Sequence, residues 1–269
     1  FDEAERVLQQ ALAVRRRLLG EHRDTCNTLM FLSSALADRD PEQALRVVDE
    51  GLQMRLRVFG PDSPAIGEAY KRMGRIQRDL GRLDESERLL RLGLENWLAA
   101  LGDGGAEVAA ARYDLALTLR ALGRHDEAVS LLQKALASAE AVLGPISMQA
   151  NQYADELVRT LLAVGRWQEA EARLRSAIAV LREARPNGTP LLFFLDAQLA
   201  AARLGLGAAA EARDLAHGAW LGLADNPNIW AKDKRFVLET LIRSHEALGD
   251  DEAAAPFRAK LAELAGRDY

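Results

Sequence analysis

The side chains that could carry acid–base or metal chemistry are few and scattered along the chain. Its four histidines stand in no H-x-x-x-H pair and have no cysteine partner; they are His22, His125, His217 and His245. Cys26 is the only cysteine, so neither an intramolecular disulfide nor a cysteine-built zinc site can form. The sequence therefore predicts no metal, no cofactor and no catalytic site, and we expect this chain not to be an enzyme.

One segment matches the letters of a dinucleotide-binding fingerprint. Gly205, Gly207 and Ala210 follow the pattern G-x-G-x-x-A, which binds pyrophosphate only where it links a β-strand to the next helix. Here helical patterns lie on both sides, so we interpret the segment as a turn between helices. Asn187-Gly188-Thr189 matches a glycosylation sequon and is also interpreted as a turn.

A basic stretch stands out in an acidic chain. The net charge is −5 and the isoelectric point is about 5.6, which favours neither nucleic acid nor a membrane surface as partner. Between Glu68 and Arg82, however, five basic residues stand against two acidic ones. Arginine and lysine on a sheltered surface bind carboxylates well, so this stretch favours an acidic protein or peptide as partner.

The sequence shows no membrane-spanning segment and no export signal. No run of about 18 uncharged apolar residues occurs, so no membrane-spanning helix is expected. No charged segment followed by an apolar stretch precedes the first repeat, as a signal peptide would require. Together with the single cysteine, this pattern favours a reducing, cytoplasmic location.

The elements that must position the basic stretch follow a period of 42 residues. Leu-Gly or Val-Gly returns at this interval, with the glycines at Gly81, Gly123, Gly165, Gly207 and Gly249. Small residues recur on the same period in pairs seven apart, as at Ala128 and Ala135, which places both on one helix face and lets a neighbouring helix approach closely. Such a period indicates stacked repeats.

Each repeat is predicted to contain helix A, a tight turn, helix B and a polar loop. In the third repeat, helix A is expected over 107–122 and helix B over 126–143, with Gly123 in a left-handed turn between them. A second series is expected to end each helix B: Gly20, Gly60, Gly102, Gly144 and, in the next place, Pro186. The predicted fold is all-α, a right-handed α-solenoid of antiparallel helix pairs with about thirteen helices.

We interpret residues 1–269 as a single array. Residues 1–19 match a helix B without its helix A, and helix pairs are expected over 22–60, 61–102, 103–144, 145–186, 187–228 and 229–266. A solenoid rarely begins in the middle of a repeat, because its exposed apolar edge needs a cap. The chain is therefore expected to be the C-terminal part of a longer protein.

These repeats resemble a known family. Leu115-Ala116-x-x-Leu119 followed by Leu122-Gly123-Arg124-His125-Asp126-Glu127-Ala128 is similar to a tetratricopeptide repeat, and the 42-residue period resembles its kinesin-light-chain type. The resemblance implies protein–protein interaction. The repeat style, rich in Ala, Leu and Arg, also resembles arrays attached to bacterial serine/threonine protein kinases and regulators. It implies a scaffold in a larger bacterial signalling protein; the alternatives are a kinase regulatory region and a peptide-sensing domain.

The resemblance also implies which residues bind the partner. In this family helix A lines the inner surface at positions i, i+3, i+7 and i+10. This assigns a peptide-binding groove to Lys71, Arg72, Arg75, Arg78, Tyr113, Arg120 and Arg159; the alternative is that these are ordinary solvated side chains. An apolar stripe that begins at Phe194 would suit a hydrophobic anchor or a second copy, so a homo-oligomer stays open. Many kinesin-light-chain-type repeats carry asparagine where this chain has Arg72, Asp114, Glu156 and Gln198.

Overall fold

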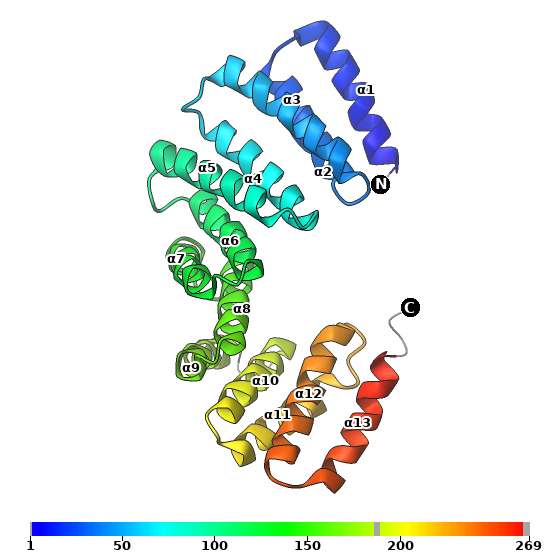
Figure 1. Ribbon diagram of the computed structural model, residues 1–269, viewed down its shortest axis with the longest axis vertical. Coiled ribbons are helices and arrows are strands. Elements are labelled where there is room, and N and C mark those ends of the chain that lie inside the picture. Colours follow the sequence, from blue (N-terminus) through cyan, green and yellow to red (C-terminus); the bar gives the residue numbers. More distant parts are fainter. Residues whose placement is uncertain (1, 186–188, 266–269) are drawn as a thin grey trace. The chain divides into compact units, whose positions relative to one another are not determined.

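The computed structural model describes residues 2–185 and 189–265, and within them the chain forms thirteen α-helices and no strand (Figure 1). It divides into two compact units, residues 1–153 and 154–269. The first unit contains α1 (Asp2–Leu19), α2 (Arg23–Leu36), α3 (Pro41–Phe59), α4 (Pro64–Asp79), α5 (Leu83–Leu101), α6 (Ala106–Ala121) and α7 (His125–Leu143). The division falls within α8 (Met148–Ala163), and the second unit continues with α9 (Trp167–Ala184), α10 (Pro190–Gly205), α11 (Ala209–Leu223), α12 (Ala231–Ala247) and α13 (Asp251–Ala265).

The predicted fold class, an all-α solenoid of antiparallel helix pairs, is confirmed. Helices that follow one another in the chain pack together from α1 to α7 and again from α9 to α13. The helix pair predicted for the third repeat appears as α6 and α7, with every boundary within one residue of the prediction. Pro186, Asn187 and Gly188, where the sequence predicts the end of a repeat and a turn, lie outside the described residues.

The periodic glycines make the turns within the helix pairs. All five have φ between 74° and 81°, a left-handed conformation that L-residues with a side chain avoid. After α6, the N–H of Gly123 donates to the carbonyl of Arg120 at 3.0 Å, and the N–H of Arg124 donates to Leu119 at 2.8 Å. These bonds satisfy carbonyls that the end of the helix would otherwise leave open, so the glycine fixes where helix A ends.

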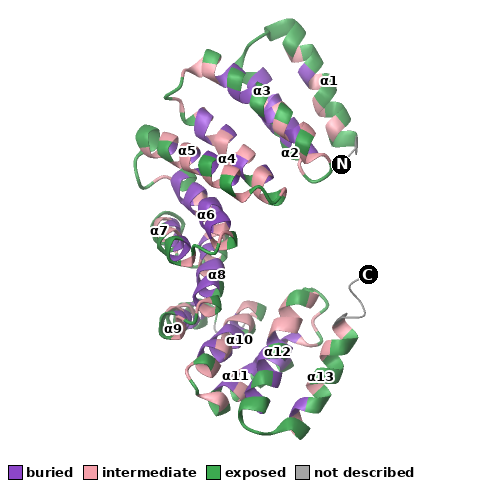
Figure 2. Cartoon of the chain, viewed as in Figure 1, coloured by how far each residue is buried: buried purple, intermediate pink, exposed green. Residues whose placement is uncertain are grey.

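In the first unit, small residues let helices A and B approach closely. A Cβ built on Gly93 of α5 would lie 3.0 Å from the carbonyl oxygen of Gly67 on α4, so the two backbones nearly touch there. The ring of Trp97 lies against the same Gly67, and its indole N–H donates to the Pro64 carbonyl at 2.8 Å. Ile66 of α4, Leu90 of α5 and Val108 of α6 are all buried as a result, and Figure 2 shows α6 as largely buried.

In the second unit, an alanine-rich seam plays the same part. Ala212, Ala216 and Ala219 of α11 are buried together with Val237 and Leu238 of α12. Alanine side chains are short, so the helices they line can pack at close range. The second unit therefore has its own apolar core.

The segment that matches the dinucleotide-binding pattern G-x-G-x-x-A connects two helices of this second unit. α10 ends at Gly205, Gly207 takes φ 81° in the turn, and α11 begins at Ala209. No strand precedes it within the described ranges, so the interpretation as a turn is confirmed. Gly205 has a packing role instead, because a Cβ there would lie 2.3 Å from the ring of Trp167.

Candidate peptide-binding surface

The basic residues predicted to bind a partner gather on one face of α4. Lys71, Arg72, Arg75 and Arg78 succeed one another at helical spacing, with α2 on one side and α6 on the other, since polar contacts reach both helices. No helix within the described ranges is both long and apolar enough to cross a membrane. In the same ranges no three His, Cys, Asp or Glu side chains are placed to hold a metal ion.

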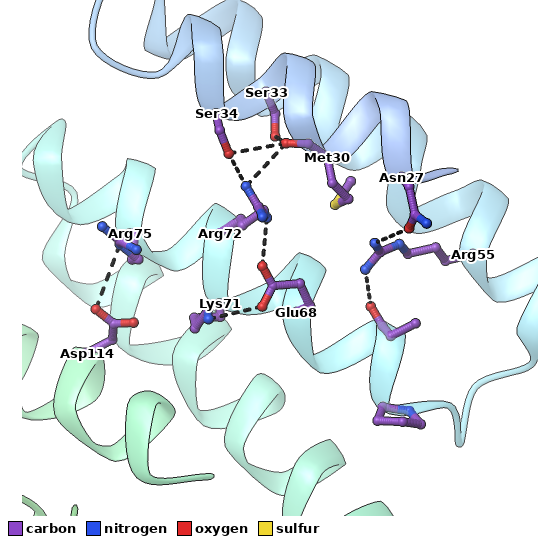
Figure 3. A network of polar contacts seen from close by, with 12 residues as sticks. Asn27, Met30, Ser33, Ser34, Arg55, Glu68, Lys71, Arg72, Arg75 and Asp114 are labelled. Carbon is purple, nitrogen blue, oxygen red and sulfur yellow. Dashed lines mark hydrogen bonds and ion pairs between the residues drawn. The ribbon is translucent and has the colours of Figure 1, made fainter. Parts of the chain in front are cut away.

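Glu68 lies on α4 at the N-terminal end of the row and binds two of its cations. Its carboxylate is 3.0 Å from Lys71 Nζ and 2.8 Å from Arg72 Nε (Figure 3). Burial alone would raise the pKa of Glu68, but the charges of Lys71 and Arg72 outweigh it and lower the pKa below its ordinary value. One carboxylate thus fixes two basic side chains of α4.

Arg72 is held more firmly than the other basic residues of the row. Besides Glu68, its guanidinium donates to the Met30 carbonyl at 3.2 Å and to the Ser34 hydroxyl of α2 (Figure 3). Lys71 is held from another side, because its Nζ lies 5.2 Å from the centre of the Trp97 ring. Both side chains are therefore oriented before any partner arrives.

Asp114 of α6 faces the other end of the row. Its Oδ1 lies 3.8 Å from Arg75 Nε and 3.6 Å from an Arg78 nitrogen. Burial raises the pKa of Asp114, and the charges of Arg75, Arg78 and Lys71 act in the opposite direction. Arg78 also pairs with Asp79 at 3.4 Å. Three carboxylates thus offset most of the charge of four cations.

Arg75 is the cation that this arrangement leaves open to solvent. Its side chain is 56% exposed, against 18% for Lys71, 25% for Arg72 and 18% for Arg78. Its contact with Asp114 is also the longest of the ion pairs in the row. Arg75 is therefore the member best placed to meet an incoming carboxylate.

A groove runs between α2 and α4 beside this arginine. Its volume is about 170 Å³. The lining residues are Ser33 and Ser34 from α2, Ala37 and Asp38 from the turn that follows α2, and Arg72, Arg75, Ile76 and Asp79 from α4. Two of the predicted binding residues therefore line a real depression of the surface.

Tyr113 continues the surface on α6. Its ring stacks on the buried ring of Tyr153, with 4.8 Å between centroids, and Gln152 donates to its hydroxyl at 3.2 Å. Tyr113 itself is half-buried, so part of the residue remains accessible. The cluster offers an aromatic face and polar atoms in the same unit as Arg75.

The two remaining predicted residues lie on other helices. Arg120 is half-buried near the end of α6 and already takes part in an interaction within the chain. Arg159 lies on α8 in the second unit, where it is exposed and acts on the charge of Asp155. The structure thus brings the four α4 residues together on one helix face.

Three residues that matter here were not assigned to the site from the sequence. Asp114 appeared only as a substitute for an asparagine, and Ser34 and Asp38 were not singled out at all. Glu68, by contrast, could be recognised as a partner of Lys71 and Arg72 because i, i+3 and i, i+4 neighbours meet on a helix. The four-residue spacing of Ser34 and Asp38, at the end of the preceding helix A and in the turn after it, was the available signal for the α2 side.

The pairing around Glu68 predicts an acid-sensitive contribution to stability. Because its pKa is lowered in the folded state, the stabilisation is complete above the ordinary value of 4.5 and is lost as the pH falls through the folded value. Glu68→Gln should therefore make the urea midpoint less dependent on pH, measured from neutral pH to about pH 3.5. Glu95→Gln, an exposed site on α5, should keep the wild-type slope; equal slopes in all three proteins would contradict the prediction.

Comparison with known proteins identifies the repeats. One tetratricopeptide-repeat model matches residues 68–141 and 107–183, and a second matches residues 1–24, so the matches together span just over half of the chain. No curated protein sequence matches the chain.

Solved structures show the same fold. The TPR-like repeats of a protein described as a kinesin light chain of Podosopora anserina have a TM-score of 0.71 at 20% identity, covering 78% of this chain and 100% of that chain. BtubC (BKLC) of P. vanneervenii has a TM-score of 0.64 at 14% identity, over 100% and 92%. YrrB, described as a TPR protein with an unusual peptide-binding site, has a TM-score of 0.55 at 16% identity, over 80% and 94%.

Proposed function

Because the chain belongs to the tetratricopeptide-repeat family, we propose that it is a scaffold whose α4 surface binds an acidic segment of a partner protein. The observation that carries the proposal is the state of Arg75. It is the exposed cation of a row whose other members are held by Glu68, Asp114 and Asp79. The paired cations of the row hold the shape of the surface, and the exposed Arg75 contacts the ligand.

The size of the expected interaction decides what kind of ligand fits. An ion pair at a site as exposed as Arg75 contributes about 1 kcal/mol or less. One such pair cannot hold a partner, so binding needs further contacts, and the half-buried Tyr113 supplies an aromatic one. A peptide that extends over several side chains fits better than a small anion.

The structural neighbours add support of a general kind. YrrB is described as a TPR protein with a peptide-binding site, and its fold matches this chain over 80% of the length. The repeats of this chain bind protein or peptide in the same general sense. The acidic character of the ligand rests on Arg75 and its neighbours alone.

Arg75→Glu should weaken binding of selected peptides by about tenfold, since it removes one attraction and adds one repulsion. The probes are peptides enriched from a random twelve-residue library on the full chain, with affinities measured by fluorescence anisotropy. Arg46→Glu, the same charge reversal at an exposed position of α3, should leave the affinity unchanged. Reversing Lys71 or Arg78 is a poorer test, because glutamate there would face Glu68 or Asp114. Equal loss in the Arg75 and Arg46 variants would rule out the α4 surface.

We infer the cellular setting from the style of the repeats. Their Ala-, Leu- and Arg-rich composition resembles that of arrays in cytoplasmic bacterial signalling proteins, serine/threonine kinases among them. In that setting the array recruits a substrate or regulator to an enzyme on the same polypeptide. Deleting the array from the full-length protein should then reduce modification of the partner while activity toward a short peptide persists.

A further inference from the structure

The groove between α2 and α4 carries opposite charges at its two ends. The residues towards the start of the groove are Ser34 on α2 and Arg72 on α4, and those towards its end are Asp38 and Asp79. The two helices run in the same direction, since each is the helix A of its repeat. The groove therefore changes sign along its length.

The basic end has donors in fixed positions. Arg72 is held by the Met30 carbonyl, the Ser34 hydroxyl and Glu68, which fixes the plane of its guanidinium (Figure 3). Arg75 follows one turn later and is 56% exposed. A carboxylate that enters beside these two arginines finds charge-assisted donors that need little reordering.

The acidic end has an unused carboxylate. Asp38 is exposed, and among residues 2–185 and 189–265 it has no hydrogen-bond or ion-pair partner. Asp79, on the opposite wall, is 66% exposed and is only partly neutralised by Arg78 at 3.4 Å. A uniformly acidic segment that lies along the whole groove would meet both carboxylates and be repelled there.

The spacing of the two ends matches that of an extended peptide. Ser34 lies in the last turn of α2, and Asp38 lies in the turn just after the helix, where Ala37 keeps a helical conformation. A rise of about 1.5 Å per residue then places the two about 6 Å apart along the groove. An extended chain advances about 3.3 Å per residue and places every second side chain on the same side. Two positions along such a peptide therefore span about the same distance as that from Ser34, which contacts Arg72, to Asp38.

We propose that the α2–α4 groove selects an extended peptide segment with an acidic and a basic residue two positions apart. The acidic side chain contacts Arg72 and Arg75, and the basic side chain contacts Asp38. This inference rests on the proposed function and narrows it, because the partner is read by paired opposite charges and not by net negative charge.

The test uses a phage-displayed random twelve-residue library selected on the full chain and on charge variants. On the wild type, enriched sequences should carry an acidic and a basic residue two apart more often than the library does. On Asp38→Lys the enriched pairs should become acidic–acidic, and Asp38→Asn should lose the preference for the basic residue. Asp49→Lys, the same charge change at an exposed position of α3, should keep the wild-type preference.

A synthetic peptide with a sequence enriched on the wild type allows the binding affinities to be measured. Replacing its basic residue by glutamate should weaken binding to the wild type by about tenfold, since it removes one attraction to Asp38 and adds one repulsion. The same replacement should strengthen binding to Asp38→Lys. Circular dichroism of each variant verifies that it is folded.

The outcomes separate this inference from the proposed function. Enrichment of purely acidic peptides that is sensitive to Arg75→Glu but not to Asp38→Lys would overturn the paired-charge inference and leave the acidic ligand standing. Enrichment that responds to neither change, or no enrichment at all, would overturn both.

Discussion

Trp97→Ala should lower the free energy of unfolding of the first unit by about 3–5 kcal/mol. Trp97 is 2% exposed and belongs to a cluster with Val108 and Ala111 of α6. Its indole N–H also donates to the Pro64 carbonyl at the start of α4. The substitution therefore leaves a cavity where α4, α5 and α6 meet, and it removes a hydrogen bond from a partly buried carbonyl.

The control is a tryptophan that the repeats do not bury. Trp230 is 70% exposed before α12, with Lys232 Nζ 5.1 Å from its ring centre, so Trp230→Ala should change stability by no more than about 0.5 kcal/mol. Urea titrations followed by circular dichroism give both values, and a second transition would be fitted separately because the chain has two compact units. Similar losses in the two variants would show that Trp97 does not join the three helices.

The fold could be predicted because the repeat constrains it many times over. The glycine at each 42-residue step predicts a left-handed turn, and Gly81, Gly123 and Gly165 all adopt that conformation. The small residues seven apart place the contact face of helix B, so helix boundaries follow within about a turn. Each repeat shows the same pattern again. A misleading helix propensity at one position therefore does not change the predicted fold.

The candidate site could be predicted only in part. The period places Lys71, Arg75 and Arg78 on one face, but it does not say which cations are neutralised. Glu68 was within reach of the sequence because its partners are three and four residues away. Asp114 pairs across repeats, and its distance from Arg75 depends on how α6 packs on α4. That packing is a property of the assembled unit, so the distinction between structural and exposed cations required the structure.

Gly205→Ala should destabilise the second unit by about 1–3 kcal/mol, although alanine is the better helix former by about 1 kcal/mol. Gly205 closes α10, where a Cβ would lie 2.3 Å from one atom of the Trp167 ring and 2.6 Å from another. Such contacts cannot exist, so the ring or the end of α10 must move. The clash outweighs the gain in helix propensity.

Gly218→Ala provides a control of opposite sign in the same unit. Gly218 lies in the exposed part of α11, and a Cβ there would meet nothing within 4 Å. Here propensity acts alone, so alanine should stabilise the unit by about 0.5–1 kcal/mol. Urea midpoints of the two variants should therefore move in opposite directions from the wild type. A stabilising Gly205→Ala would mean that this glycine serves the turn and not the contact with Trp167.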